Sequence, residues 1–107
     1  MAEVAIRFSA DPVFKRAMAT RHGAEGVFYR DDLPAGTSRF DYDDKILSFV
    51  CPCGCAMVHQ VAIYAEGQPA HGWKWNGDHE RPTLSPSIAI TTGCHWHGHL
   101  VDGTFKD

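Results

Sequence analysis

Two clusters of cysteine and histidine carry the residue types that are best suited to metal chemistry. Cys51, Cys53 and Cys55 fall within one short stretch, and Cys94 and His97 follow much later with Cys-x-x-His spacing. Thiolates and imidazoles are the ligands that tetrahedral zinc prefers, and a small domain commonly surrounds one ion with two separate short motifs. The sequence therefore predicts a Zn²⁺ site formed by Cys94, His97 and at least two of the three clustered cysteines.

The spacing leaves the ligand set open. Cys51 and Cys55 have the usual gap between paired zinc ligands, whereas Cys53 and Cys55 lie closer together. His99 is an alternative to His97, because it follows two residues later. A site with four protein ligands would be structural, since no coordination position would remain for a substrate. An iron–sulfur centre of the Rieske type is disfavoured, because the first motif lacks a histidine.

An open metal position would instead make the site a hydrolase centre. A zinc-bound water would then attack the substrate, with His99 or Glu80 as general base. A nucleophilic serine has little support, because the chain lacks the Gly-x-Ser-x-Gly sequence of a nucleophile elbow. We therefore favour a binding or regulatory module with a structural zinc over an enzyme, and keep a small zinc-dependent hydrolase as the alternative.

A surface for a ligand or a protein partner is expected on the tryptophan and Pro-Thr-Leu-Ser segments. Two tryptophans two residues apart share one face of an extended strand, and alternating hydroxyl residues follow in a Pro-Thr-Leu-Ser-Pro-Ser stretch. The expected surface comprises Trp73, Trp75, Thr83, Ser85, Ser87 and His99. The alternative roles are core packing for the tryptophans and backbone hydrogen bonding for the hydroxyls.

Length, composition and charge narrow the class of protein. The chain has 107 residues, of which 44% are hydrophobic and 21% charged, as expected for one globular domain. The formal net charge is -3 and the basic residues are scattered, so nucleic acid is a weak candidate and a protein partner is preferred. The apolar runs are too short to span a bilayer, and the first residues do not resemble a signal peptide. These features favour a cytoplasmic protein without membrane contact. In that reducing compartment, metal binding is expected of the cysteines rather than disulfides.

The first part of the chain is expected to add a strand, a helix and a second strand. Residues 4–8 alternate between apolar and polar side chains, as in a half-buried strand. Asp11 is a suitable N-cap for a helix over residues 12–22, which carries an apolar stripe and ends before Gly23. Residues 26–30 are a candidate strand.

The second part is expected to be β-structure. Residues 45–50 and 57–64 predict a hairpin with the cysteine cluster at its tip. Two prolines make residues 82–90 an extended edge segment, and Asp-Gly predicts a hairpin turn within residues 99–105. The predicted class is α+β, mainly antiparallel β, with one N-terminal helix. Residues 1–107 form a single domain, in which residues 45–105 are the zinc-binding core and residues 1–44 precede it.

Five motifs together resemble a family of small bacterial and phage-borne domains of unknown function. They are Cys-Pro-Cys-Gly-Cys at residues 51–55, the tryptophan segment at residues 72–77, Pro-Thr-Leu-Ser-Pro-Ser-Ile at residues 82–88, Cys-x-x-His at residues 94–97, and the Asp-Gly turn at residues 101–103. The resemblance covers residues 45–105. It implies a metal-binding domain and raises a further alternative, a phage-encoded regulator that captures a host protein or nucleic acid.

Overall fold

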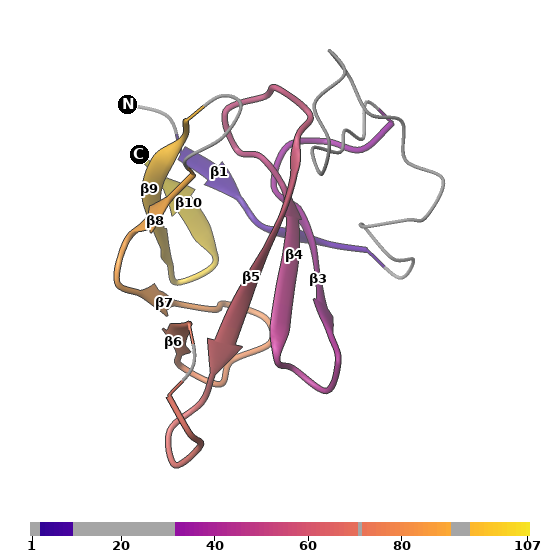
Figure 1. Ribbon diagram of the computed structural model, residues 1–107. Coiled ribbons are helices and arrows are strands. Elements are labelled where there is room, and N and C mark those ends of the chain that lie inside the picture. Colours follow the sequence, from indigo (N-terminus) through magenta and orange to yellow (C-terminus); the bar gives the residue numbers. More distant parts are fainter. Residues whose placement is uncertain (1–2, 10–31, 71, 91–94) are drawn as a thin grey trace, which may run out of the picture.

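A computed structural model describes residues 3–9, 32–70, 72–90 and 95–107 of the chain. Within these residues ten β-strands form two sheets, and no helix is present (Figure 1). The predicted α+β class is therefore wrong, and the described part of the protein is all-β. The predicted helix over residues 12–22 and the predicted strand over residues 26–30 lie outside the described residues. No described segment is a helix long and apolar enough to cross a membrane.

The larger sheet has six strands in the order β2-β3-β4-β5-β6-β7. These strands are β2 (Arg7–Phe8), β3 (Thr37–Asp41), β4 (Ile46–Val50), β5 (Val58–Tyr64), β6 (Trp73–Trp75) and β7 (Leu84–Ser85). The pairs β2–β3 and β5–β6 are parallel, and the other neighbours are antiparallel. β4 and β5 pair from Ile46 opposite Ala62 to Val50 opposite Val58. This pairing confirms the predicted hairpin that carries the cysteine cluster at its tip.

The smaller sheet has four antiparallel strands in the order β1-β10-β9-β8. These strands are β1 (Glu3–Ala5), β8 (Ile88–Ala89), β9 (His97–Val101) and β10 (Thr104–Lys106). β9 and β10 are joined by Asp102 and Gly103, whose φ angles of 51° and 77° are those of a tight Asp-Gly turn. The predicted closing hairpin is thus confirmed.

Two segments pass from one sheet to the other (Figure 1). The strand predicted over residues 4–8 is divided at Ile6, whose N–H donates to the Gly103 carbonyl, into β1 of the smaller sheet and β2 of the larger. The extended segment predicted over residues 82–90 is divided in the same way, with the cis Ser85–Pro86 peptide bond between β7 and β8. β7 and β8 each lie at an edge of their own sheet among the described strands, which confirms the predicted edge segment.

One buried cluster joins the two sheets. Alternate residues of β4 and β5 point into it, including Leu47, Phe49 and Ile63, and the smaller sheet contributes Leu100 and Phe105. The rings of Phe49 and Phe105 lie 5.1 Å apart between centroids, which places the two sheets in direct contact. Apolar burial between the sheets therefore stabilises the fold and fixes how the edge strands lie relative to each other.

Candidate functional site

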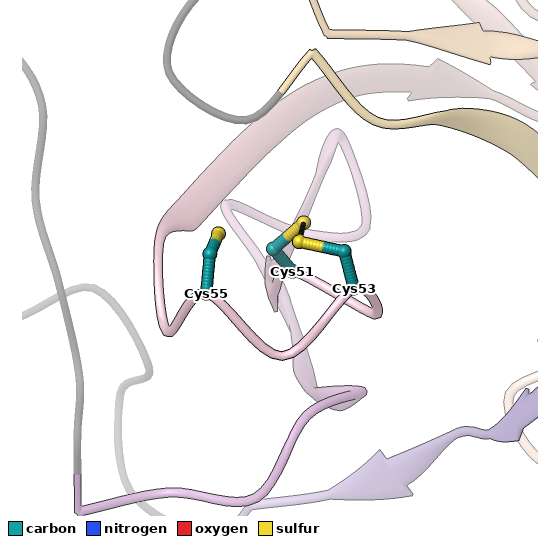
Figure 2. A group of neighbouring side chains, drawn as sticks. All are labelled: Cys51, Cys53 and Cys55. Atoms are coloured by element: carbon teal, nitrogen blue, oxygen red, sulfur yellow. Dashed lines mark hydrogen bonds between the residues drawn. The ribbon is translucent and has the colours of Figure 1, made fainter.

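The cysteine cluster forms a tight turn between β4 and β5 (Figure 2). The Cys51 N–H donates to the Met57 carbonyl at 2.7 Å, and the Gly54 N–H donates to the Cys51 carbonyl at 3.2 Å. Gly54 and Ala56 have φ angles of 91° and 69°, so the backbone curls back on itself. As a result, all three cysteine side chains point to the same side of the turn.

The three sulfur atoms are close enough to share one metal ion. All three lie within 4.8 Å of one another, and the Cys51 and Cys53 sulfurs are 3.3 Å apart. Zinc–sulfur bonds of about 2.3 Å in a tetrahedron place neighbouring sulfurs about 3.8 Å apart, a value within this span. Cys51 is buried, Cys55 is half-buried and Cys53 is exposed. The three cysteines can therefore hold a metal ion.

The other two predicted metal ligands, Cys94 and His97, are not seen next to the three cysteines in the described part of the chain. Cys94 lies outside the described residues. His97 is exposed at the start of β9. Among the described residues, the group whose ligand atoms lie close enough to share a metal ion consists of Cys51, Cys53 and Cys55 and does not include His97. Its Nε2 atom lies 3.1 Å from Ser87 Oγ. The His97 imidazole is thus within hydrogen-bonding distance of a serine hydroxyl.

The pairing of β8 with β9 brings Ser87 and His97 together. Ala89 lies opposite His97 and Ile88 opposite Gly98, so Ser87, directly before β8, is diagonal to His97. Ile88 and Gly98 are buried, whereas Ala89 and His97 are exposed. Because side chains alternate along a strand, Ser87 and His97 share the outer face of the smaller sheet.

The backbone of Ser87 is held by the larger sheet. The Trp73 indole Nε1 on β6 donates to the Ser87 carbonyl oxygen at 3.1 Å. The indole therefore ties the segment between β7 and β8 to β6, and it does so at the residue whose hydroxyl contacts His97. No carboxylate of the described residues is hydrogen-bonded to His97.

The loop that leads into β7 is tied down by side chains. Asn76 Oδ1 accepts hydrogen bonds from the backbone N–H groups of Asp78 and Thr83 at 3.2 and 3.1 Å, and its Nδ2 donates to the Arg81 carbonyl at 3.3 Å. The Asp78 carboxylate accepts from the N–H groups of Arg81 and Glu80, and these bonds lower its pKa. Such a loop presents the following strand in one fixed position.

The same loop is anchored to the turn between β9 and β10. Arg81 forms an ion pair with Asp102, and Thr83 Oγ1 accepts a hydrogen bond from the Asp102 N–H at 2.8 Å. The Gly103 N–H donates to the Pro82 carbonyl at 2.9 Å. Both the segment with Ser87 and the hairpin with His97 are therefore fixed to one loop.

The residues of the predicted partner surface have different environments. Trp75 is buried in the core, with 5% of its surface exposed, and Trp73 is half-buried against it. Ser85 and His99 are exposed. A hollow of about 200 Å³ is lined by Lys74, Trp75, Asn76, Thr83 and Ser85. Part of the predicted surface thus lines one hollow beside β7.

Sequence reasoning placed Ser87 and His97 in different roles and missed their contact. It assigned His97 to the metal and Ser87 to a partner surface. The signal that could have joined them is the closeness in the sequence of two extended segments, residues 88–89 and 97–101. Pairing these segments as a hairpin places residues 87 and 97 on one face.

Comparison with known proteins identifies a protein family that matches the chain. A family model described as "Bacterial ubiquitination-like system serine protease (BubE)" matches residues 23–106. No curated protein and no solved structure matches the chain. The expected resemblance to a small bacterial domain family is confirmed at that level, since the match spans most of the sequence. The chain therefore belongs to the BubE family of serine proteases of bacterial ubiquitination-like systems.

Proposed function

We propose that this protein is a serine peptidase in which Ser87 is the nucleophile and His97 the general base. The observation that carries the proposal is the 3.1 Å contact between Ser87 Oγ and His97 Nε2 on an exposed sheet face. A serine hydroxyl is a weak nucleophile until a neighbouring base accepts its proton, and a histidine at this distance can do so. Membership of a serine protease family supports the same assignment. This proposal replaces the binding module favoured from the sequence.

The reaction follows from the chemistry of the pair. Ser87 Oγ adds to the carbonyl carbon of a peptide bond while its proton passes to His97 Nε2. The C–N bond then breaks, and His97 gives the proton to the departing amine. A water molecule, deprotonated by His97, attacks the remaining ester, which releases the carboxylic acid and restores Ser87. From the family's description, we propose that the substrate is a protein modifier of a ubiquitination-like system or a conjugate of one.

An activity-based probe tests the assignment without knowledge of the substrate. An alkyl fluorophosphonate should label Ser87, and mass spectrometry of the digested protein should locate the adduct there. Ser87→Ala should abolish labelling, and His97→Gln should slow it by about 100-fold or more, because the base is lost. Ser85→Ala is the matched control and should label normally. Labelling at another serine, or labelling unaffected by His97→Gln, would overturn the proposal.

We also propose a structural Zn²⁺ at the cysteine turn, with Cys51, Cys53 and Cys55 as ligands and Cys94 as the fourth. The convergence of three sulfur atoms within 4.8 Å supports it. Three clustered thiols in this setting are the donor set that zinc prefers, and the ion would neutralise the thiolates. The contact of His97 with Ser87 favours Cys94 over His97 as the remaining ligand. Zinc held this way would cross-link the β4–β5 turn to the segment that precedes β9.

A further inference from the structure

One edge of β8, which pairs with none of the described strands, offers backbone hydrogen-bonding groups two residues from Ser87. The Ile90 N–H donates to the Trp96 carbonyl at 2.8 Å, and Ile88 lies opposite Gly98 in the same pairing. In an antiparallel pair the bonded residues alternate, so Ile88 and Ile90 face β9 and the N–H and C=O of Ala89 point away from it. Among the described strands, none pairs with that side of β8.

The Ser87 carbonyl lies on the same edge and already accepts a hydrogen bond. By the same alternation it points away from β9, and the Trp73 indole N–H donates to it at 3.1 Å. A strand added along the edge could therefore bond to Ala89 but could not continue past Ser87 in the plane of the sheet. It would have to leave the edge there, beside the face that carries Ser87 Oγ and His97 Nε2.

We propose that an extended segment of the substrate polypeptide docks as an added strand on this edge of β8. Its backbone bonds to the N–H and C=O of Ala89, and it turns at Trp73 to present a carbonyl to Ser87. This inference rests on the proposed peptidase function and specifies the substrate as an extended chain rather than a folded loop. Main-chain bonds supply the affinity in this mode of recognition.

The length of the edge argues for a substrate rather than a second copy of the chain. β8 has only two residues, and Ala89 alone turns its backbone groups outward. One donor and one acceptor suit a segment that must leave after each turnover. A stable dimer needs a much larger interface than this edge supplies.

The test compares two reagents that attack the same serine. One is a small ethyl fluorophosphonate, and the other is a trialanyl fluorophosphonate. Both lose fluoride when Ser87 Oγ bonds to phosphorus, and they differ in the peptide part that can add as a strand. We expect the peptide reagent to inactivate the protein at least about tenfold faster than the small one, because strand addition holds it in place. Methylation of the amide nitrogen that bonds to the Ala89 carbonyl should remove this advantage without any change to the protein. A set of peptide reagents, each methylated at a different amide nitrogen, identifies which nitrogen makes this bond.

Two variants test the same edge from the protein side. Ala89→Pro removes the outward N–H at an edge position where proline is tolerated, and it should lower the ratio of the two inactivation rates. Ala89→Ser keeps the N–H and should retain the ratio, and circular dichroism checks that both variants fold.

Equal rates for the peptide reagent and all its methylated forms would overturn docking at β8. An absence of labelling by either reagent would instead overturn the peptidase assignment. A dimer that Ala89→Pro dissociates would assign the edge to a second copy and overturn the proposal.

Discussion

His59 is a buried histidine without a hydrogen-bond partner for its Nε2 atom among the described residues. It lies on β5 opposite Phe49, their ring centroids are 5.3 Å apart, and 7% of its surface is exposed. Burial disfavours the charged imidazolium and lowers the pKa from 6.5 to about 4. Protonation of this side chain therefore opposes folding.

The protein should lose stability in acid through His59. In the unfolded chain His59 takes up a proton near pH 6.5, whereas in the folded chain it does so only near pH 4. The contribution of neutral His59 to the free energy of unfolding is therefore complete above pH 6.5 and is lost as the pH falls toward 4. Urea unfolding should show a free energy of unfolding lower by about 2 to 3 kcal/mol at about pH 4.5 than at about pH 7 from this group alone. His59→Leu should remove that part of the difference, since a leucine does not titrate. An identical pH dependence in the variant would contradict the assignment.

At this scale the sequence predicted the convergence of the three thiols better than the contact between Ser87 and His97. Cys51, Cys53 and Cys55 are neighbours in the chain, so their spacing alone indicates that their thiols can converge. Ser87 and His97 meet only because two strands pair in one register, and a shift by one residue would place one of them on the opposite face. Residue type alone could not predict that the imidazole of His97 contacts a serine hydroxyl.

β9 has a glycine between its two exposed histidines for a steric reason. A Cβ atom on Gly98 would overlap the Lys106 carbonyl oxygen on β10 and would lie 2.6 Å from Trp96 Cζ2. The backbone of β9 thus lies unusually close to its neighbours at the residue after His97. Any side chain at position 98 has to push the strand away from β10.

Gly98→Ala should therefore destabilise the protein and disturb the contact between His97 and Ser87. Overpacking of this kind costs about 1 to 3 kcal/mol, which thermal unfolding should detect. Fluorophosphonate labelling of Ser87 should also slow, because His97 moves with the strand. Gly67→Ala is the control: its φ of 85° strains an added side chain, but nothing lies within 4 Å of the new Cβ atom. That variant should lose some stability and keep its labelling rate. Equal labelling in the two variants would contradict this account of Gly98.

The β4–β5 hairpin should depend on the proposed zinc ion. We expect elemental analysis to find one zinc per chain, and expect both Cys51→Ser and Cys94→Ser to lose it. Structural zinc contributes on the order of 10 kcal/mol, which is comparable to the whole stability of a small domain. Removal of the ion by a chelator should therefore lower the melting temperature sharply, and addition of zinc should restore it. A wild-type protein that stays fully folded without metal would refute the structural role.

Across the whole molecule, the sequence indicated hairpins more readily than the pairing of distant segments. The β4–β5 and β9–β10 pairings are local, and alternation together with turn residues predicted both. The pairing of β1 with β10 joins segments from opposite ends of the sequence, and no local pattern encodes it. The same holds for the parallel pair β2–β3. The division of the extended segment at residues 84–89 between two sheets likewise depends on how the sheets pack.

The position of β10 between β1 and β9 has a consequence for synthesis on the ribosome. A nascent chain that has emerged as far as residue 103 already contains Ser87 and His97, yet of the smaller sheet's described pairings only β8 with β9 is available to it. A lone two-stranded hairpin is at best marginally stable in water. On the proposed peptidase function, activity should therefore appear only when the segment containing β10 clears the exit tunnel. Ribosome-bound chains arrested before and after that point, each treated with fluorophosphonate, would reveal such a delay.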